Sequence, residues 1–338
     1  MAQTTGNVTQ KREVKMSTVP SVSIDELEYQ ALVSGATVQL RPLFGTLCLT
    51  DKDRVDFLQR MTTNDIARLQ PGRAALTVLT SPVARIDAVF TVLCRQDDLL
   101  LLTSKGEAEN LRQCLQGQIF FMDKVNVADE SAALHRLRLL GPAARDLLPA
   151  AGLPQPADDD SFGEEAGVTV LRQERFDLPG YELICPADEL PALMERLTEA
   201  GALPLSDSLA YETRRVELGR PQPGSELTDA FNPLEAGLAW VCAENKGCYT
   251  GQEIIARQIT YDKVTRSLVR LRSDLPLTAG DPISVDGRRV GSVTSSALSP
   301  TRGPLALAIV KQPHNVEGAS VSVEGTPAYV ERIPPTEC

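Results

Sequence analysis

The C-terminal part of this chain has a sequence pattern that strongly constrains the fold. Short β-rich runs recur there, separated by turn signals such as Asp286-Gly287. The runs cover residues 268–271, 282–285, 290–295, 305–310, 320–323 and 328–330. Short strands at regular spacing, with turns between them, are typical of β-sandwiches and small barrels. We therefore predict an all-β barrel over residues 266–338, with a domain boundary near residue 265.

The chain before residue 265 reads differently, because strand-like and helix-like segments alternate along it. Strands are expected at residues 43–50, 74–80, 86–93, 99–103, 136–140, 168–171 and 181–184. Helices are expected at residues 51–61, 105–115, 120–124, 188–200 and 206–218. Alternation of this kind predicts an α+β unit.

Residues 1–35 are predicted to form a flexible tail that contains one short helix near residues 24–32. The tail lacks the apolar core of a secretory signal, and no apolar run approaches the roughly 18 residues that span a bilayer. The formal net charge of -11 gives no general attraction to nucleic-acid phosphates. We expect a cytoplasmic protein if the source is bacterial, or a mitochondrial-matrix protein if it is eukaryotic, without direct nucleic-acid or membrane binding.

Cysteine and histidine usage gives no sign of a metal site. The chain has 2 His and 7 Cys, which are Cys48, Cys94, Cys114, Cys185, Cys242, Cys248 and Cys338. They are widely spaced and no CxxC pair occurs, so spacing predicts no metal ligands. Most of the cysteines lie in apolar runs and are expected to be buried thiols in a reducing compartment.

One cysteine has a distinct setting, within the string KGCYTGQE at residues 246–253. Thr250 and Glu253 have the spacing of a capping box before an apolar run, which predicts a helix that starts at Thr250. The helix N-terminus and the nearby ammonium of Lys246 would both favour a thiolate at Cys248. Cys248 is therefore the candidate reactive thiol. The residues alone also allow a small side chain in a tight turn between two glycines.

The same string resembles the signature motif of the YgfZ family of folate-binding proteins, which are relatives of the glycine-cleavage T-protein (aminomethyltransferase) superfamily. The likeness extends over nearly the whole chain from about residue 40. Residues 53–69 resemble the FLQ…TND segment of T-proteins, residues 215–219 (RVELG) their RxEAG segment, and residues 279–300 their barrel. The resemblance implies a T-protein-like ring of two α/β domains plus a C-terminal small β-barrel. Residues 36–265 would form the folate-binding region, with its second α/β subdomain at roughly 136–204.

The resemblance also implies which residues bind the folate. In T-proteins the Glu of the RxEAG segment hydrogen-bonds the pterin ring, and the matching residue is Glu217. A carboxylate can accept two parallel N–H bonds from a pterin edge. Lys246 falls where those relatives have a basic residue for the glutamyl carboxylate, and Tyr249 and Arg257 are assigned by their proximity to the motif. From the residues alone, Glu217 could instead pair with a neighbouring arginine, and Lys246 could be a solvated loop residue.

One departure from the T-protein pattern limits the activity that the resemblance implies. T-proteins carry a pair of Asp in a strand of the first domain, and one of the two is needed for aminomethyl transfer. An ungapped reading puts Ala88 and Val89 at these positions, with Asp87 one residue away. Because a shift of one residue turns a strand side chain to the other face, Asp87 would point away from the site. A different register would restore transferase chemistry.

These features predict a folate-binding accessory protein that supports assembly or repair of iron–sulfur (4Fe–4S) clusters in client enzymes, tRNA-modifying enzymes included. The cofactor would be tetrahydrofolate or a derivative. The partners would be iron–sulfur assembly proteins and the client enzymes, with Cys248 as the functional thiol of transient contacts. The alternative is a folate-dependent one-carbon transferase or demethylase, although a classical aminomethyltransferase is not expected.

Overall fold

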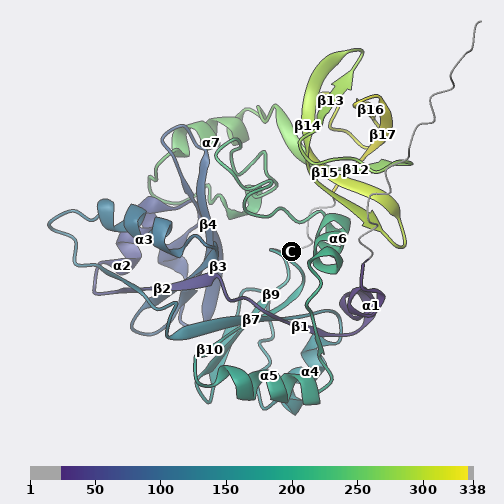
Figure 1. The fold of residues 1–338 in the computed structure, drawn as a ribbon. Coiled ribbons are helices and arrows are strands. Elements are labelled where there is room, and N and C mark those ends of the chain that lie inside the picture. Colours follow the sequence, from purple (N-terminus) through teal and green to yellow (C-terminus); the bar gives the residue numbers. More distant parts are fainter. Residues whose placement is uncertain (1–23, 334–338) are drawn as a thin grey trace, which may run out of the picture.

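A computed structural model describes residues 24–333 of the protein. Two sheets with their helices and a closed barrel surround helix α6 (Ser208–Leu218), as Figure 1 shows. The predicted fold class, two α/β domains plus a C-terminal barrel, is confirmed. None of the described helices is long and apolar enough to cross a membrane.

The first α/β domain is built on a 5-stranded antiparallel sheet with the order β3-β4-β5-β2-β6. Its strands are β2 (Phe44–Thr50), β3 (Arg73–Thr80), β4 (Ile86–Cys94), β5 (Leu99–Lys105) and β6 (Asn126–Asp129). In β5, Leu99 and Leu101 face helices α2 (Arg54–Met61) and α3 (Ala108–Gly117), whereas Leu100 and Leu102 face the second sheet. The run of four leucines is therefore apolar throughout because both faces of the strand are covered.

The second domain has a 6-stranded sheet with the order β11-β1-β7-β10-β9-β8. Its strands are β1 (Thr37–Leu40), β7 (Leu134–Leu140), β8 (Phe162–Glu165), β9 (Val168–Gln173), β10 (Gly180–Pro186) and β11 (Leu203–Pro204). Helices α4 (Ala144–Ala150) and α5 (Leu190–Glu199) pack on it. The subdomain predicted at roughly 136–204 thus also contains β1, which pairs antiparallel with β7 and parallel with β11. A local sequence pattern does not report pairing between segments so far apart.

The C-terminal strands close into a barrel with the order β12-β15-β14-β13-β16-β17. They are β12 (Arg266–Ser273), β13 (Pro282–Val285), β14 (Arg288–Ser299), β15 (Gly303–Lys311), β16 (Ser320–Val323) and β17 (Thr326–Glu331). Alternate residues of β15 have different surroundings: Ala306, Ala308 and Val310 fill the barrel, whereas Leu305 and Leu307 pack against Val216 of α6. The barrel therefore has an interior rich in Val and Ala and one outer apolar face on α6.

Helix α1 (Glu26–Ser34) packs against helix α6, and this contact attaches the N-terminal segment to the rest of the molecule. Helix α1 contributes Tyr29 and Leu32 to the contact, so these residues of the predicted tail are built into the fold. Residues 1–23, the rest of that tail, lie outside the described residues. Helix α6, expected at residues 206–218, begins after Asp207, whose side chain accepts the N–H groups of Leu209 and Ala210.

Two predicted helix features are wrong. Residues 120–124 form no helix, because the Asp123 amide donates to the Phe120 carbonyl and closes a single turn. Helix α7 (Gln252–Thr260) starts after Gly251, which has φ 82° and makes no side-chain cap, so the predicted capping box of Thr250 and Glu253 does not form. The left-handed glycine turns the chain before the helix can begin at Thr250.

Candidate functional site

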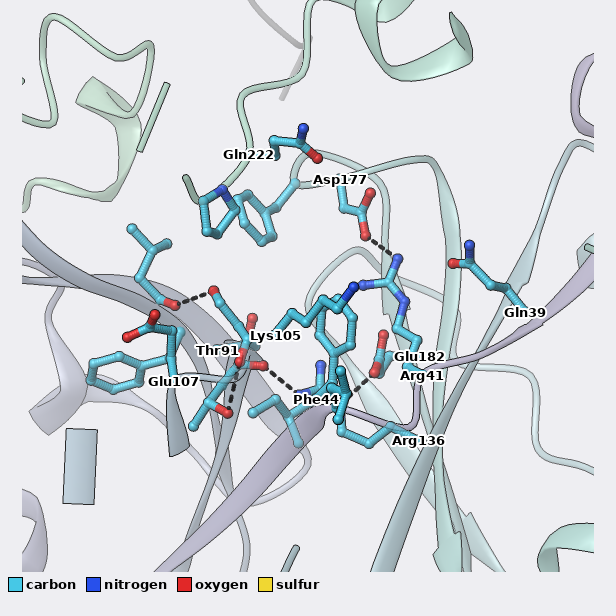
Figure 2. A pocket seen from close by; sticks show the side chains of 18 of the residues that line it. Gln39, Arg41, Phe44, Thr91, Lys105, Glu107, Arg136, Asp177, Glu182 and Gln222 are labelled. Carbon is cyan, nitrogen blue, oxygen red and sulfur yellow. Dashed lines mark hydrogen bonds and ion pairs between the residues drawn. The ribbon is translucent and has the colours of Figure 1, made fainter. Parts of the chain in front are cut away.

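A cavity of about 500 Å³ lies where the two sheets meet α6 (Figure 2). It is lined by residues 39–44, 89–91, 102–105, 211–212 and 221–224, together with Glu107, Arg136, Gln173, Phe176, Asp177 and Glu182. The wall mixes aromatic and aliphatic side chains with a small set of charged and amide groups. Its size and composition are those of a small-molecule site.

An ion-pair network fixes one wall of this cavity. Arg41 Nη2 donates to Asp177 Oδ2 over 2.6 Å and to the Tyr211 hydroxyl over 3.0 Å, and that hydroxyl donates to Asp177 Oδ1. Burial raises the pKa of Asp177, but the charges of Arg41 and Arg138 outweigh burial and hold it at about 2. Burial and the Asp177 charge raise the pKa of Tyr211. The network therefore ties β1, α6 and the β9–β10 turn around an ionised carboxylate.

Phe44 forms a second fixed feature, between two guanidinium groups and the cavity. The Cζ atoms of Arg41 and Arg136 lie 4.5 Å and 5.5 Å from its ring centre. Arg136 is held by Glu182 Oε1 at 2.6 Å and by the Gly45 and Thr103 carbonyls. Figure 2 shows these side chains together at one wall. They give a planar ligand a rigid aromatic surface.

Two charged side chains of the wall keep polar atoms without a partner. The exposed ammonium of Lys105 has no hydrogen bond or ion pair within residues 24–333. Glu212 Oε2 accepts from Arg215 over 2.8 Å and from Gln222 over 3.1 Å, but Oε1 accepts from none of the described residues. The cavity thus offers the Lys105 ammonium and the Glu212 Oε1 oxygen to a ligand.

Strand β4 forms one wall of the cavity. By the resemblance, it corresponds to the strand that carries the acidic pair in T-proteins. Val89 lines the cavity, and Ala88 packs into the core beneath α2 and α3. Asp87 occupies a β-bulge, because Leu79 pairs with Ala88 while Thr80 pairs with Ile86. Asp87 is exposed and does not line the cavity. Burial of its carboxyl and then the charge of Asp229 raise its pKa.

Glu107, at the start of α3, does line the cavity near this wall. Its backbone amide donates to the Ser104 carbonyl over 3.1 Å, and the Ser104 hydroxyl donates to the Val89 carbonyl over 3.0 Å. These contacts hold Glu107 beside β4, so a carboxylate reaches this part of the cavity from α3 and not from the strand.

The KGCYTGQE segment packs against the turn between β3 and β4. The Thr80 hydroxyl donates to the Thr250 carbonyl over 2.6 Å. A Cβ on Gly251 would lie 2.7 Å from the Ser81 carbonyl oxygen and 3.0 Å from Ala84 Cα, so glycine is required there. Cys248, three residues earlier, is exposed and outside the cavity lining.

Lys246 anchors this segment to the first domain. Its ammonium donates to the Thr62 and Asn64 carbonyls and lies 5.2 Å from the centre of the Tyr249 ring. Burial lowers the pKa of Lys246 to about 8. Tyr249 is buried against Ala84, and burial raises its pKa. Lys246 and Tyr249 therefore lie together, but neither lines the central cavity.

Glu217 lies on the side of α6 that faces α1 and the barrel. Its Oε1 accepts from the hydroxyls of Tyr29 over 2.7 Å and Ser299 over 2.6 Å, and its Oε2 accepts from Arg214 over 2.9 Å. Arg257 is exposed on α7. Cys248, Glu217, Lys246, Tyr249 and Arg257 all lie outside the lining of this cavity. Their folate-binding roles stay predictions.

The helical period explains why Glu212 and Glu217 point in different directions. They are five positions apart, which places the two side chains about 140° apart around α6. The sequence match selected the residue that points to the barrel, and the cavity lies on the other side. Arg41 and Lys105 were missed because no local pattern marks them.

Two α/β domains that border a ligand-sized cavity, with a barrel packed on α6, define a three-part binding protein or enzyme. Residues 24–246 match the GCVT N-terminal domain, and residues 266–331 match the glycine cleavage T-protein C-terminal barrel domain. The chain therefore belongs to the glycine-cleavage T-protein family.

Individual relatives agree with this assignment. The chain is 30% identical over 329 residues to an Arabidopsis thaliana chloroplastic protein named "Putative transferase", covering 94% of this chain and 75% of that protein. It is 31% identical over 302 residues to an aminomethyltransferase of Geobacillus kaustophilus, covering 83% and 80%. The structure of the glycine cleavage system aminomethyltransferase T of Bartonella henselae superposes with a TM-score of 0.82 at 23% identity, covering 91% and 88% of the two chains. That likeness supports the fold.

Proposed function

We propose that this protein binds a reduced folate in the central cavity and supports assembly or repair of 4Fe–4S clusters in client enzymes, tRNA-modifying enzymes included. The observation that carries the proposal is the β4 wall, where Val89 lines the cavity and Asp87 lies outside it. A T-protein cavity without its strand carboxylate can hold folate but lacks the group that serves aminomethyl transfer. The YgfZ-type motif at residues 246–253 supports the accessory role.

The residues around the cavity fit a folate by their chemistry. A pterin has a flat face and a donor-rich edge, which match Phe44 and the unpaired oxygen of Glu212. A glutamyl tail is anionic and matches the unpaired ammonium of Lys105. When bound, the folate would supply one-carbon chemistry at its ring nitrogens. The chain's own contribution is to position it and to exclude water.

Cys248 would act outside this cavity. It is exposed in a segment held on both sides, by Lys246 on the first domain and by Gly251 on the β3–β4 turn. A thiol on such a fixed, accessible segment is available to a partner protein or a small thiol. The folate site and the thiol therefore serve separate contacts.

The test is a deletion strain of the source organism assayed for cluster-dependent enzyme activity. The wild-type gene should restore activity and Cys248→Ser should not, at equal protein level. Cys114→Ser is the matched control, because Cys114 is also an exposed free thiol. Normal cluster-enzyme activity in the deletion strain, or full restoration by Cys248→Ser, would contradict the proposal.

Glu107 supports the second candidate, folate-dependent one-carbon transfer, because a carboxylate lines the cavity near Val89. Formation of methylenetetrahydrofolate from an aminomethyl-loaded lipoyl carrier protein would favour it. That turnover should be lost in Glu107→Gln and kept in Asp87→Asn. Turnover at the no-enzyme rate would reject it.

A further inference from the structure

Three large apolar side chains stand in a row on the surface directly after α3. Phe120, Phe121 and Met122 have exposed fractions of 66%, 97% and 73%. They lie beside α2 and α3, on the side of the molecule away from the barrel (Figure 1). Single exposed apolar residues are ordinary, but a contiguous group on a monomer marks an interaction site.

The backbone of this segment forms a turn, and its central residues are not the types that turns favour. The Asp123 amide donates to the Phe120 carbonyl over 2.9 Å, so Phe121 and Met122 are the two central residues. Central turn positions favour Gly, Pro, Asn, Asp and Ser, because these residues suit turn dihedrals or satisfy turn backbone groups. Neither turn chemistry nor core packing accounts for a Phe-Met pair here.

The turn is also held rigidly. Asp123 Oδ2 accepts the Phe120 amide over 2.9 Å and pairs with the Arg60 guanidinium. Asp53 Oδ2 accepts the Lys124 amide over 2.9 Å, which fixes the chain just after the turn. An apolar tip that is ordered before binding loses little conformational entropy when a partner covers it.

We propose that this tip, residues 120–122, docks into an apolar pocket of a partner protein whose rim offers backbone acceptors. The Phe121 and Met122 amides have no hydrogen-bond partner among the described residues. A bilayer interior would leave them unpaired, whereas backbone carbonyls of a protein rim can accept them. The inference rests on the proposed function, since an accessory factor has to dock on its client or on an assembly protein.

Shape and charge argue against the two other occupants. Three such side chains present roughly 500 Å², so against the about 800 Å² per partner of a stable interface the tip would be the anchor of a wider contact. Two convex tips would not fit each other. The net charge of -11 repels the chain from an anionic leaflet.

The first experiment complements the deletion strain with the double variant Phe121→Ser, Met122→Ser. We expect at least a tenfold loss of restored cluster-enzyme activity, with folate Kd within twofold of wild type and an unchanged melting temperature. The matched control is Leu275→Ser, Val316→Ser, two scattered residues on the barrel side with exposed fractions of 59% and 55%. If wild type restores activity and the double variant does so equally, the docking inference is wrong. If the wild-type gene restores no cluster-enzyme activity, the proposed function is wrong. The second experiment then tests by itself whether the tip binds a partner protein.

The second experiment places a photo-crosslinking phenylalanine analogue at position 121 or, as control, at position 275. We expect one partner protein at 121 only. That protein, purified, should bind wild type and bind the double variant at least tenfold more weakly by calorimetry. Crosslinking only to a second copy of this chain, or no specific crosslink, would overturn the inference. Co-sedimentation with phosphatidylcholine vesicles that the double variant loses would also overturn it, in favour of a lipid surface.

Discussion

Arg41 donates to the Asp177 carboxylate over 2.6 Å, and this contact links the strand that enters the second sheet to the turn between β9 and β10. Both side chains are nearly buried, at 7% and 11% exposure. Removing one partner of a buried pair leaves the other charge without compensation. The contact therefore matters to the fold and to the cavity that it borders.

Arg41→Ala should lower the free energy of unfolding by about 3 kcal/mol, the usual cost of breaking a buried pair from one side. Urea denaturation at pH 7 measures it. Arg112→Ala is the control, because the Arg112–Glu109 pair is surface-exposed and screened by solvent, so its loss should change stability far less. Equal losses in the two variants would show that Arg41 stabilises no more than a surface pair.

The folate site can be assigned by three substitutions measured by calorimetry. Lys105→Ala and Glu212→Gln should each weaken folate binding about tenfold, or about 1.4 kcal/mol. Glu217→Gln should leave the affinity within twofold and lower the melting temperature, because Glu217 joins α1, α6 and the barrel. The sequence match makes the opposite prediction for Glu217. A large affinity loss in Glu217→Gln alone would restore that assignment.

Two glycines of the Cys248 segment should respond differently to the same change. Gly251→Ala places a Cβ 2.7 Å from the Ser81 carbonyl oxygen at a φ of 82°, whereas a Cβ on Gly247 meets nothing within 4 Å. We expect Gly251→Ala to lower stability by about 2 kcal/mol or more, through strain at a left-handed position. Gly247→Ala should change it by less than about 0.5 kcal/mol. Thermal unfolding and iodoacetamide labelling of Cys248 are the measurements, and equal behaviour of the two variants would refute the packing role of Gly251.

Asp160 should make the protein less stable as the pH rises to neutral. Burial and then the charge of Asp159 raise the pKa of Asp160 to about 7. A raised folded-state pKa means that the folded chain keeps a proton that the unfolded chain loses above about pH 4. The stabilisation is therefore full below about pH 4 and is lost as the pH rises through 7.

Asp160→Asn removes this titration and suits the φ of 55° at that position. We expect the variant to be more stable than wild type at pH 8, on the order of 2 kcal/mol. The gain should shrink toward pH 4. Asp158→Asn is the control, because that side chain is 76% exposed. A gain that does not depend on pH would indicate a cause other than titration of Asp160.

Much of the local structure was predictable from the sequence. Regular turns after residue 265 indicated the barrel, and the pattern over residues 206–218 indicated α6. The KGCYTGQE string identified a segment that holds an exposed cysteine between two anchors. These features depend on neighbouring residues, so short sequence windows contain them.

The cavity itself could not be predicted in this way. Its walls bring residues 39–44 beside Asp177 and Tyr211, which is a consequence of β1 pairing with β7 and β11. The bulge at Asp87 depends on the register of β3 against β4. Neither pairing leaves a mark in the local pattern.

The sequence by itself determined most of the strands and helices, and that the C-terminal part forms a barrel, because side-chain period and turn chemistry are local. Only the tertiary structure decided which side chains meet. It turned Glu217 toward Ser299, left Glu212 Oε1 and the Lys105 ammonium without a partner among residues 24–333, and exposed Phe121 on a rigid turn. The physical reason is that strand register and helix rotation are set by packing between distant segments.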